Sequence, residues 1–212
     1  MSDPGTTATA GALVAPVVAV VDRLTDRERH ADELGLACAT LLSRRGGREV
    51  TVTTHWATLG ELHHVALVVE ATGLPAGEVT EALTEVVSSG TSEEPALLVD
   101  GTVSGSPRLR PVLAEVLDAH RSRAGGRVVV FPGSTTLTGT VTVADVLART
   151  PIDRVQVLGS AEPDGSAALV TRGFVRPRWS GGQLVLHAQP AVGGVLVPFE
   201  TPDPTPCCAD HA

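Results

Sequence analysis

The most unusual chemistry in the sequence lies at the end of the chain, where Cys207 and Cys208 are followed by His211. Thiolate sulfur and imidazole nitrogen are ligands that suit zinc, copper and iron. Three prolines between residues 201 and 206 predict an extended arm that loses little entropy when it binds. The sequence therefore predicts a transition-metal site (Zn, Cu or Fe) to which Cys207, Cys208 and His211 contribute.

This arm supplies three ligands close together, whereas a structural metal site usually needs four. Asp210 can add an oxygen, and His55 or the pair His63-His64 can come from the folded part of the chain. Two other interpretations stay open. One is a redox or thiol role, although adjacent cysteines bridge each other only with strain. The other is a terminal segment whose cysteines have no function.

A second group of candidate residues depends on the direction of the strands. Asp22, His55 and Asp100 each stand at the end of a predicted strand. In a parallel α/β sheet the carboxyl ends of the strands meet at one edge, where ligands bind. Two carboxylates and an imidazole there could hold Mg²⁺ or transfer protons, so these three are the candidate catalytic residues of an enzyme. The alternative is structural, because aspartate is common after strands as a turn former and helix cap.

Two glycine-rich segments, 100–106 and 132–139, each link a predicted strand to a predicted helix. Backbone N–H groups at such junctions can bind an anion. Arg108 and Arg110 beside the first segment, and Ser134 in the second, are therefore candidate ligand-binding residues for a phosphate or carboxylate. Neither segment has the spacing of an established phosphate-binding or nucleophile motif, so ordinary turns are the competing interpretation.

A basic patch occurs further along the chain. Arg172, Arg176 and Arg178, with Trp179, lie on predicted C-terminal strands and could bind an acidic partner or a phosphate. The alternative is a solvated edge whose arginines discourage strand addition.

The elements that must position these residues alternate between strands and helices as far as about residue 160. Apolar runs predict strands, apolar residues at helical spacing predict helices, and residues 59–69 fit either. The predicted strands are 17–21, 50–54, 96–99, 128–131 and 155–158; the predicted helices are 26–45, 79–87, 109–117 and 143–148. From residue 167 onward, 168–175, 184–187 and 195–199 have the pattern of antiparallel hairpins.

We therefore expect an α/β fold with a largely parallel sheet flanked by helices, antiparallel strands in the C-terminal quarter, and an extended proline-rich tail. The expected organisation is a disordered leader (1–11), an α/β core (12–160), an antiparallel β extension of the same domain (161–200) and an extended Cys/His tail (201–212).

Composition narrows the function by exclusion. The 212-residue chain contains neither lysine nor tyrosine, which removes mechanisms based on a P-loop lysine, a Schiff base or a phenolic acid. A net charge of −8 opposes binding to nucleic acid or an anionic membrane. The avoided residue types are typical of a high-GC bacterial genome, and we expect a cytoplasmic protein. The predicted functions are binding of a transition metal or small ligand, an enzyme acting on a small anionic substrate, or a non-catalytic interaction module, with homo-oligomers compatible with each.

Overall fold

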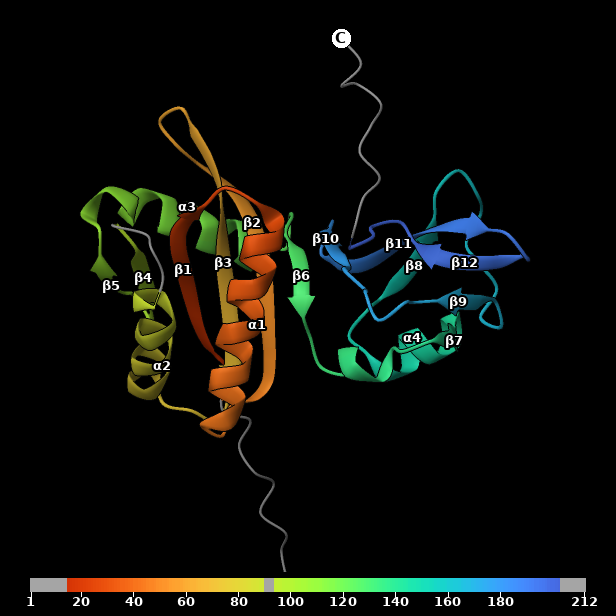
Figure 1. The fold of residues 1–212 in the computed structure, drawn as a ribbon, viewed down its shortest axis with the longest axis horizontal. Helices are drawn as coiled ribbons and strands as arrows, with labels where there is room; N and C mark the ends of the chain where they lie inside the picture. The colour runs from red at the N-terminus through yellow and green to blue at the C-terminus, as the bar shows by residue number, and fades with distance from the viewer. Residues whose placement is uncertain (1–14, 90–93, 203–212) are drawn as a thin grey trace, which may run out of the picture.

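Twelve strands and four α-helices make up the residues that the computed structural model describes, which are 15–89 and 94–202 (Figure 1). The first half of the chain forms β1 (Val17–Thr25), α1 (Glu28–Arg44), β2 (Arg48–Leu59), β3 (Leu62–Thr72), α2 (Ala76–Ser88), β4 (Ala96–Val99), β5 (Thr102–Gly105) and α3 (Arg110–Arg121). The second half forms β6 (Arg127–Val130), β7 (Thr140–Thr142), α4 (Val143–Arg149), β8 (Arg154–Val157), β9 (Ala168–Val170), β10 (Arg178–Ser180), β11 (Gln183–Ala191) and β12 (Val195–Pro198). None of the helices in these ranges is both long enough and apolar enough to cross a lipid bilayer.

Hydrogen bonding joins the strands into one sheet in the order β5-β4-β1-β3-β2-β6-β10-β11-β12-β9-β7, with β8 paired to β11. The neighbours of β1, β2 and β3 are all antiparallel to them. Parallel pairing occurs between β8 and β11, and at the Leu169–Leu196 bridge of β9 and β12. The predicted largely parallel α/β sheet is therefore wrong: the fold is α+β, with a mostly antiparallel mixed sheet.

The prediction of a parallel sheet failed because residues 62–72 form a strand. The tight turn at Gly60 and Glu61 folds β3 back along β2, and β3 then inserts between β1 and β2. The strands that α1 connects are consequently not neighbours, and alternation of strand and helix does not produce a parallel pair. β1 to β4 with α1 and α2 have the βαββαβ connectivity of a ferredoxin-like unit.

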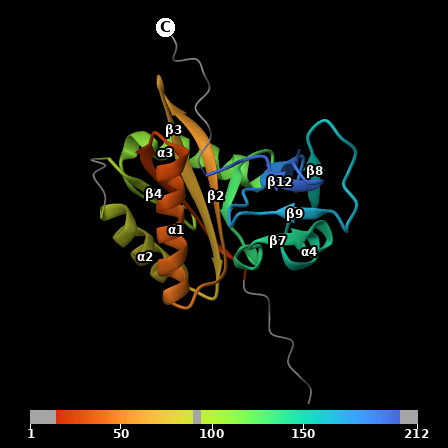
Figure 2. The same cartoon turned by 45° about the vertical axis from the view of Figure 1, so that its right-hand side comes forward.

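Helices cover both faces of this first half of the sheet (Figures 1 and 2). Ala19 and Val21 of β1 pack against α1 and α2, whereas Val20 packs against α3 on the opposite face. Burial on both sides explains why β1 is an uninterrupted apolar run and why it resembled a parallel strand in the sequence.

A separate core lies beneath the strands of the second half. It includes Leu137, Val146, Leu169, Leu184 and Leu186, all fully buried. α4 is fixed at its start by a capping box, in which Thr142 and Asp145 each bond to the other's backbone N–H. The two halves of the sheet meet where Arg127 of β6 pairs with Arg178 of β10.

Gly126 makes the turn into β6 possible. Its φ is +113°, and a Cβ atom there would lie 2.6 Å from Cε1 of His55. We expect Gly126→Ala to lower the free energy of unfolding by about 2–4 kcal/mol, because it combines a strained backbone with overpacking. Urea denaturation measures the change. Gly125→Ala is the matched control, since a Cβ at Gly125 meets no atom within 4 Å; equal losses in the two variants would contradict this account of the turn.

Candidate functional site

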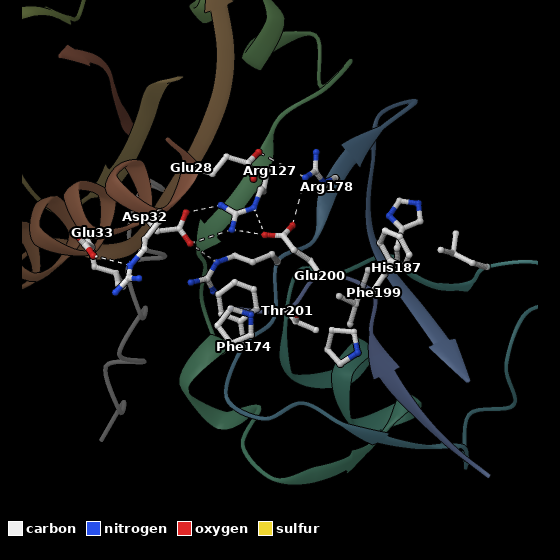
Figure 3. Close-up of a pocket in the computed structure, with 17 residues that line it drawn as sticks. Glu28, Asp32, Glu33, Arg127, Phe174, Arg178, His187, Phe199, Glu200 and Thr201 are labelled. Carbon is white, nitrogen blue, oxygen red and sulfur yellow. Dashed lines mark hydrogen bonds and ion pairs between the residues drawn. The ribbon is translucent and has the colours of Figure 1, made fainter. Parts of the chain in front are cut away.

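A pocket of about 1000 Å³ lies between α1 and the C-terminal strands (Figure 3). One part of its wall is charged and is formed by Glu28, Asp32, Arg127, Arg176, Arg178 and Glu200. Another part is apolar and is formed by Leu36, Leu158, Phe174, Leu186, Pro198 and Phe199. Residues far apart in the chain therefore build one concave surface with two chemically distinct sides, as in many small-molecule sites.

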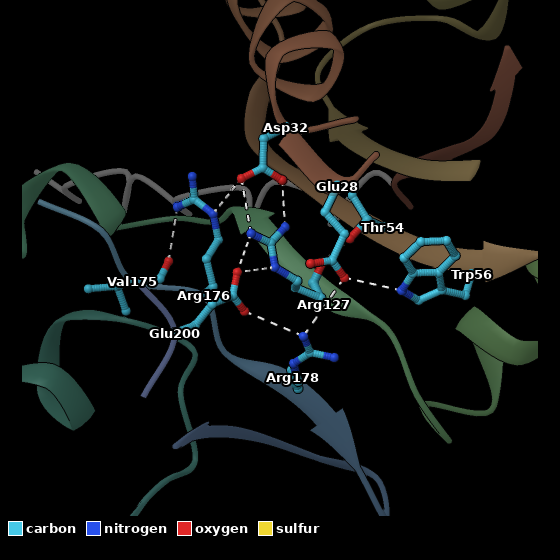
Figure 4. Close-up of polar contacts among 9 residues, drawn as sticks. All are labelled: Glu28, Asp32, Thr54, Trp56, Arg127, Val175, Arg176, Arg178 and Glu200. Atoms are coloured by element: carbon cyan, nitrogen blue, oxygen red, sulfur yellow. Dashed lines mark hydrogen bonds and ion pairs between the residues drawn. The ribbon is translucent and has the colours of Figure 1, made fainter. Parts of the chain in front are cut away.

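Arg127 is the centre of the charged wall (Figure 4). Its Nη1 donates to Oδ1 of Asp32 at 2.5 Å and its Nη2 to Oδ2 at 3.0 Å, which is the bidentate geometry of a strong guanidinium–carboxylate pair. On its other side, Nε donates to Oε1 of Glu200 at 2.6 Å. Arg127 therefore bonds to α1 and to the segment after β12 at the same time.

Two further arginines extend this cluster. Nε of Arg176 donates to Oδ2 of Asp32 at 3.1 Å. Nη2 of Arg178 lies 3.4 Å from Oε2 of Glu200 and 4.0 Å from Oε1 of Glu28. The indole of Trp56 donates to that same oxygen of Glu28. Three guanidinium groups thus pair with three carboxylates near the place where the two halves of the sheet meet.

Because the ion pairs of this cluster are buried, the loss of one partner would be costly. The side chain of Arg127 is 4% exposed, so a missing partner would leave an uncompensated charge away from water. Burial by itself would lower the pKa of Arg127, but hydrogen bonds and charge from Asp32 and Glu200 outweigh it and raise that pKa. Burial lowers the pKa of Arg176 in spite of Asp32. Burial and the charges of Arg178 and Arg154 lower the pKa of His187, which also lines the pocket.

Asp22, which was expected at the end of a strand, lies within β1 and is fully buried. Its Oδ2 is 2.8 Å from Nε2 of His64, which is also fully buried, and its Oδ1 accepts a hydrogen bond from the backbone N–H of Leu24. Both oxygens are therefore used inside the protein. Each member of the pair thus satisfies the other's buried polar group, and neither residue lines the pocket between α1 and the C-terminal strands.

His55 lies on the same face of the sheet as Asp22 but has a different partner. Its Nε2 is 3.4 Å from Nδ1 of His120 on α3, and Nε2 of His120 is 3.4 Å from Oε2 of Glu70. Burial, and then the nearby His120, lower the pKa of His55 to about 4. A hydrogen bond from His120 lowers the pKa of Glu70. This chain of side chains connects α3 to β2 and β3.

The remaining predicted residues are spread over the surface. Asp100 is exposed in the turn between β4 and β5. Arg108 pairs with Glu94, and Arg110 is exposed at the start of α3. The backbone N–H of Ser134 bonds to the carbonyl of Phe131. The sequence predicted that the carboxyl ends of parallel strands would bring together Asp22, His55 and Asp100. Because the sheet is mostly antiparallel, the strand directions give no reason to expect these residues to meet.

Cys207, Cys208 and His211 lie outside the described residues, so the zinc, copper or iron site predicted for them stays a prediction. Within residues 15–89 and 94–202, no three or more His, Cys, Asp or Glu side chains are grouped so that they could hold a metal ion.

Sequence reasoning found Arg176 and Arg178 as a basic patch but missed Asp32, Arg127 and Glu200. One signal was present: Asp32 shares its helical face with Gly35 and Ala39, both buried. An acidic residue on the apolar face of a helix requires a partner. Nothing in the local pattern points to Arg127, because it lies 95 residues further along the chain.

No protein-family model, curated protein or solved structure shows significant similarity to this chain. The function must therefore be inferred from the pocket and the residues that line it.

The His55 pair predicts how stability depends on pH. The pKa of His55 falls from 6.5 in the unfolded chain to about 4 in the folded protein, so the unfolded chain takes up the proton first. The contribution of neutral His55 to the free energy of unfolding is fully present above pH 6.5. It is lost as the pH falls from 6.5 to 4, by roughly 3 kcal/mol in total. Urea titrations across this window measure the slope. His55→Gln should flatten it relative to the unaltered protein; an unchanged slope would contradict the assignment.

Replacing Arg127 tests the charged wall. Arg127→Met keeps an unbranched apolar stem but removes the guanidinium, which leaves Asp32 and Glu200 without their central partner, so the free energy of unfolding should fall by about 3–5 kcal/mol. The control is Arg149→Met, which removes an exposed pair with Asp145 and should cost less than about 1 kcal/mol. Similar losses in the two variants, measured by urea denaturation, would show that the buried cluster contributes no more than a surface ion pair.

Proposed function

We propose that the protein binds a small organic molecule in the pocket between α1 and the C-terminal strands. The observation that carries this proposal is a cavity of about 1000 Å³ with large apolar side chains on one side and guanidinium groups on the other. Cavities of this size bury most of a small ligand, and a few polar groups on an apolar wall fix its orientation.

The apolar side of the pocket supports the proposal because its side chains are unusually exposed. Leu36, Leu158 and Phe199 are 48%, 40% and 55% exposed, and all three line the same cavity. Water beside these side chains is displaced when an apolar ligand enters, which favours binding by about 25 cal/mol per Å² covered. Exposed apolar residues gathered in one concavity are typical of a binding site, whereas single ones on a surface are common.

The charged side of the pocket supports the proposal because its side chains are held rigidly. The cluster around Arg127 draws its members from α1, β6, β10 and the segment after β12, so its geometry is fixed before any ligand arrives. Preorganised groups lose little entropy on binding. Pro202, the last residue that the structure describes, also lines the pocket, which brings the start of the predicted Cys/His arm next to this cavity.

Binding of a neutral fluorescent probe tests the proposal. N-phenyl-1-naphthylamine, whose emission rises in apolar surroundings, should bind the native protein saturably. Leu36→Glu should weaken its affinity about tenfold or more, because the new carboxylate must be desolvated or must exclude the probe. Fluorescence titration gives the dissociation constants.

Leu147→Glu is the matched control, since Leu147 is also an exposed helical leucine (39%) but does not line the pocket. Its affinity for the probe should equal that of the unaltered protein. The proposal fails if the probe does not bind, or if both variants weaken binding equally.

A further inference from the structure

Building on the proposed binding function, we infer that the ligand is an uncharged apolar molecule, and that the charged wall disfavours anions and cations alike because its own charges cancel. Three features of the described pocket lead to this ligand class. They are the alternation of charge along the wall, the bonds that its charged groups already make, and the position of the apolar side chains.

Positive and negative groups alternate along the charged wall. The row of ion pairs runs in the order Arg176, Asp32, Arg127, Glu200, Arg178 and Glu28 (Figure 4). The two other charged residues of the pocket, Arg29 and Glu33, pair with each other. Four guanidinium groups therefore balance four carboxylates, and their charges sum to zero. An ion placed beside one member of the row also lies near a neighbour of the ion's own sign, so attraction and repulsion largely offset each other.

The inner part of the row makes its bonds inside the protein. All three nitrogens of Arg127 donate to Asp32 or Glu200. Both oxygens of Asp32 accept from Arg127, and one of them also accepts from Arg176. An ion that entered the pocket would lose its hydration and would meet no uncompensated opposite charge among the described residues. An uncharged molecule has no such cost of desolvation.

The apolar side of the pocket supplies the attraction. Figure 3 shows Phe174 and Phe199 beside the ion cluster, on the side away from α1. Cζ of Arg176 is 4.2 Å from the centre of the Phe174 ring, so an aromatic face covers part of this charged group. A ligand that lies against Phe174, Phe199 and Leu36 would cover apolar surface and leave the ion pairs intact. An uncharged apolar molecule therefore matches both sides of the pocket.

The outer end of the row allows the charge balance to be changed by single substitutions. The side chains of Arg178 and Glu28 are 46% and 34% exposed, and Nη2 of Arg178 is 4.0 Å from Oε1 of Glu28. Removing either charge should cost little stability, because exposed ion pairs contribute little to it. Glu28→Gln leaves the wall with a net charge of +1 and keeps an oxygen that can accept from the indole of Trp56. Arg178→Gln leaves the wall at −1.

Octanoate, 1-octanol and octylammonium have the same number of carbons and differ in charge, so their displacement of N-phenyl-1-naphthylamine from the native protein tests the inference. At about pH 8 His187, whose pKa burial lowers, carries no charge. Octanol should displace the probe at a concentration about ten times lower than either ion. Failure of the probe to bind would overturn the proposed function and this inference together. Probe binding with either ion equal to or better than octanol would overturn the inference alone.

Charge variants separate the balance of the wall from general apolar attraction, which would also favour octanol. Glu28→Gln should improve octanoate relative to octanol about threefold or more, and Arg178→Gln should do the same for octylammonium, because each leaves one charge uncompensated. Arg149→Gln, at an exposed arginine outside the pocket, should leave both ratios unchanged. If circular dichroism shows the variants folded and the two pocket variants shift these ratios no more than Arg149→Gln does, the inference is wrong.

Discussion

A buried guanidinium that needs carboxylates from two directions is the constraint on which the rest of the structure depends. Arg127 lies at the start of β6 and is almost fully removed from water, so its charge must be neutralised locally. Asp32 supplies one carboxylate from α1, and Glu200 supplies the other from the segment after β12. These partners lie 95 and 73 residues away in sequence, and satisfying both fixes α1 against the C-terminal strands. The pocket is the space that this arrangement leaves between them.

Other features of the fold bring Arg127 to this point. Gly126 turns the chain after α3 in a conformation that other residues rarely adopt, and β6 then pairs with β2 on one edge and β10 on the other. β6 is thereby shared by both halves of the sheet. Arg123 stacks on Trp179 across the same junction, which adds a cation–π contact between the end of α3 and β10. The junction at β6 therefore accounts for the charged wall of the pocket, the turn at Gly126 and the continuity of the sheet.

Much of the local structure could be predicted from the sequence, whereas the arrangement could not. The apolar periodicity of 26–45 and 79–87 correctly predicted α1 and α2, and the helix predicted over 109–117 corresponds to α3. In the sequence, residues 59–69 fit either a helix or a strand, and the direction of the whole sheet depended on that choice, because residues 62–72 form β3. The pocket was missed for a related reason: each of its residues has an ordinary local pattern, and its chemistry arises from contacts between distant segments. Arg176 and Arg178 were recognised as basic, but their carboxylate partners lie on other elements.

The central claim is that Asp32 and Arg127 act together to hold the two halves in place. A double-mutant cycle measures this directly, with urea unfolding of the unaltered protein, Asp32→Asn, Arg127→Met and the double variant. The account predicts a coupling free energy of about 2–3 kcal/mol, because once one partner is lost the removal of the other relieves a buried charge. Additive losses, with a coupling below about 0.5 kcal/mol, would contradict it.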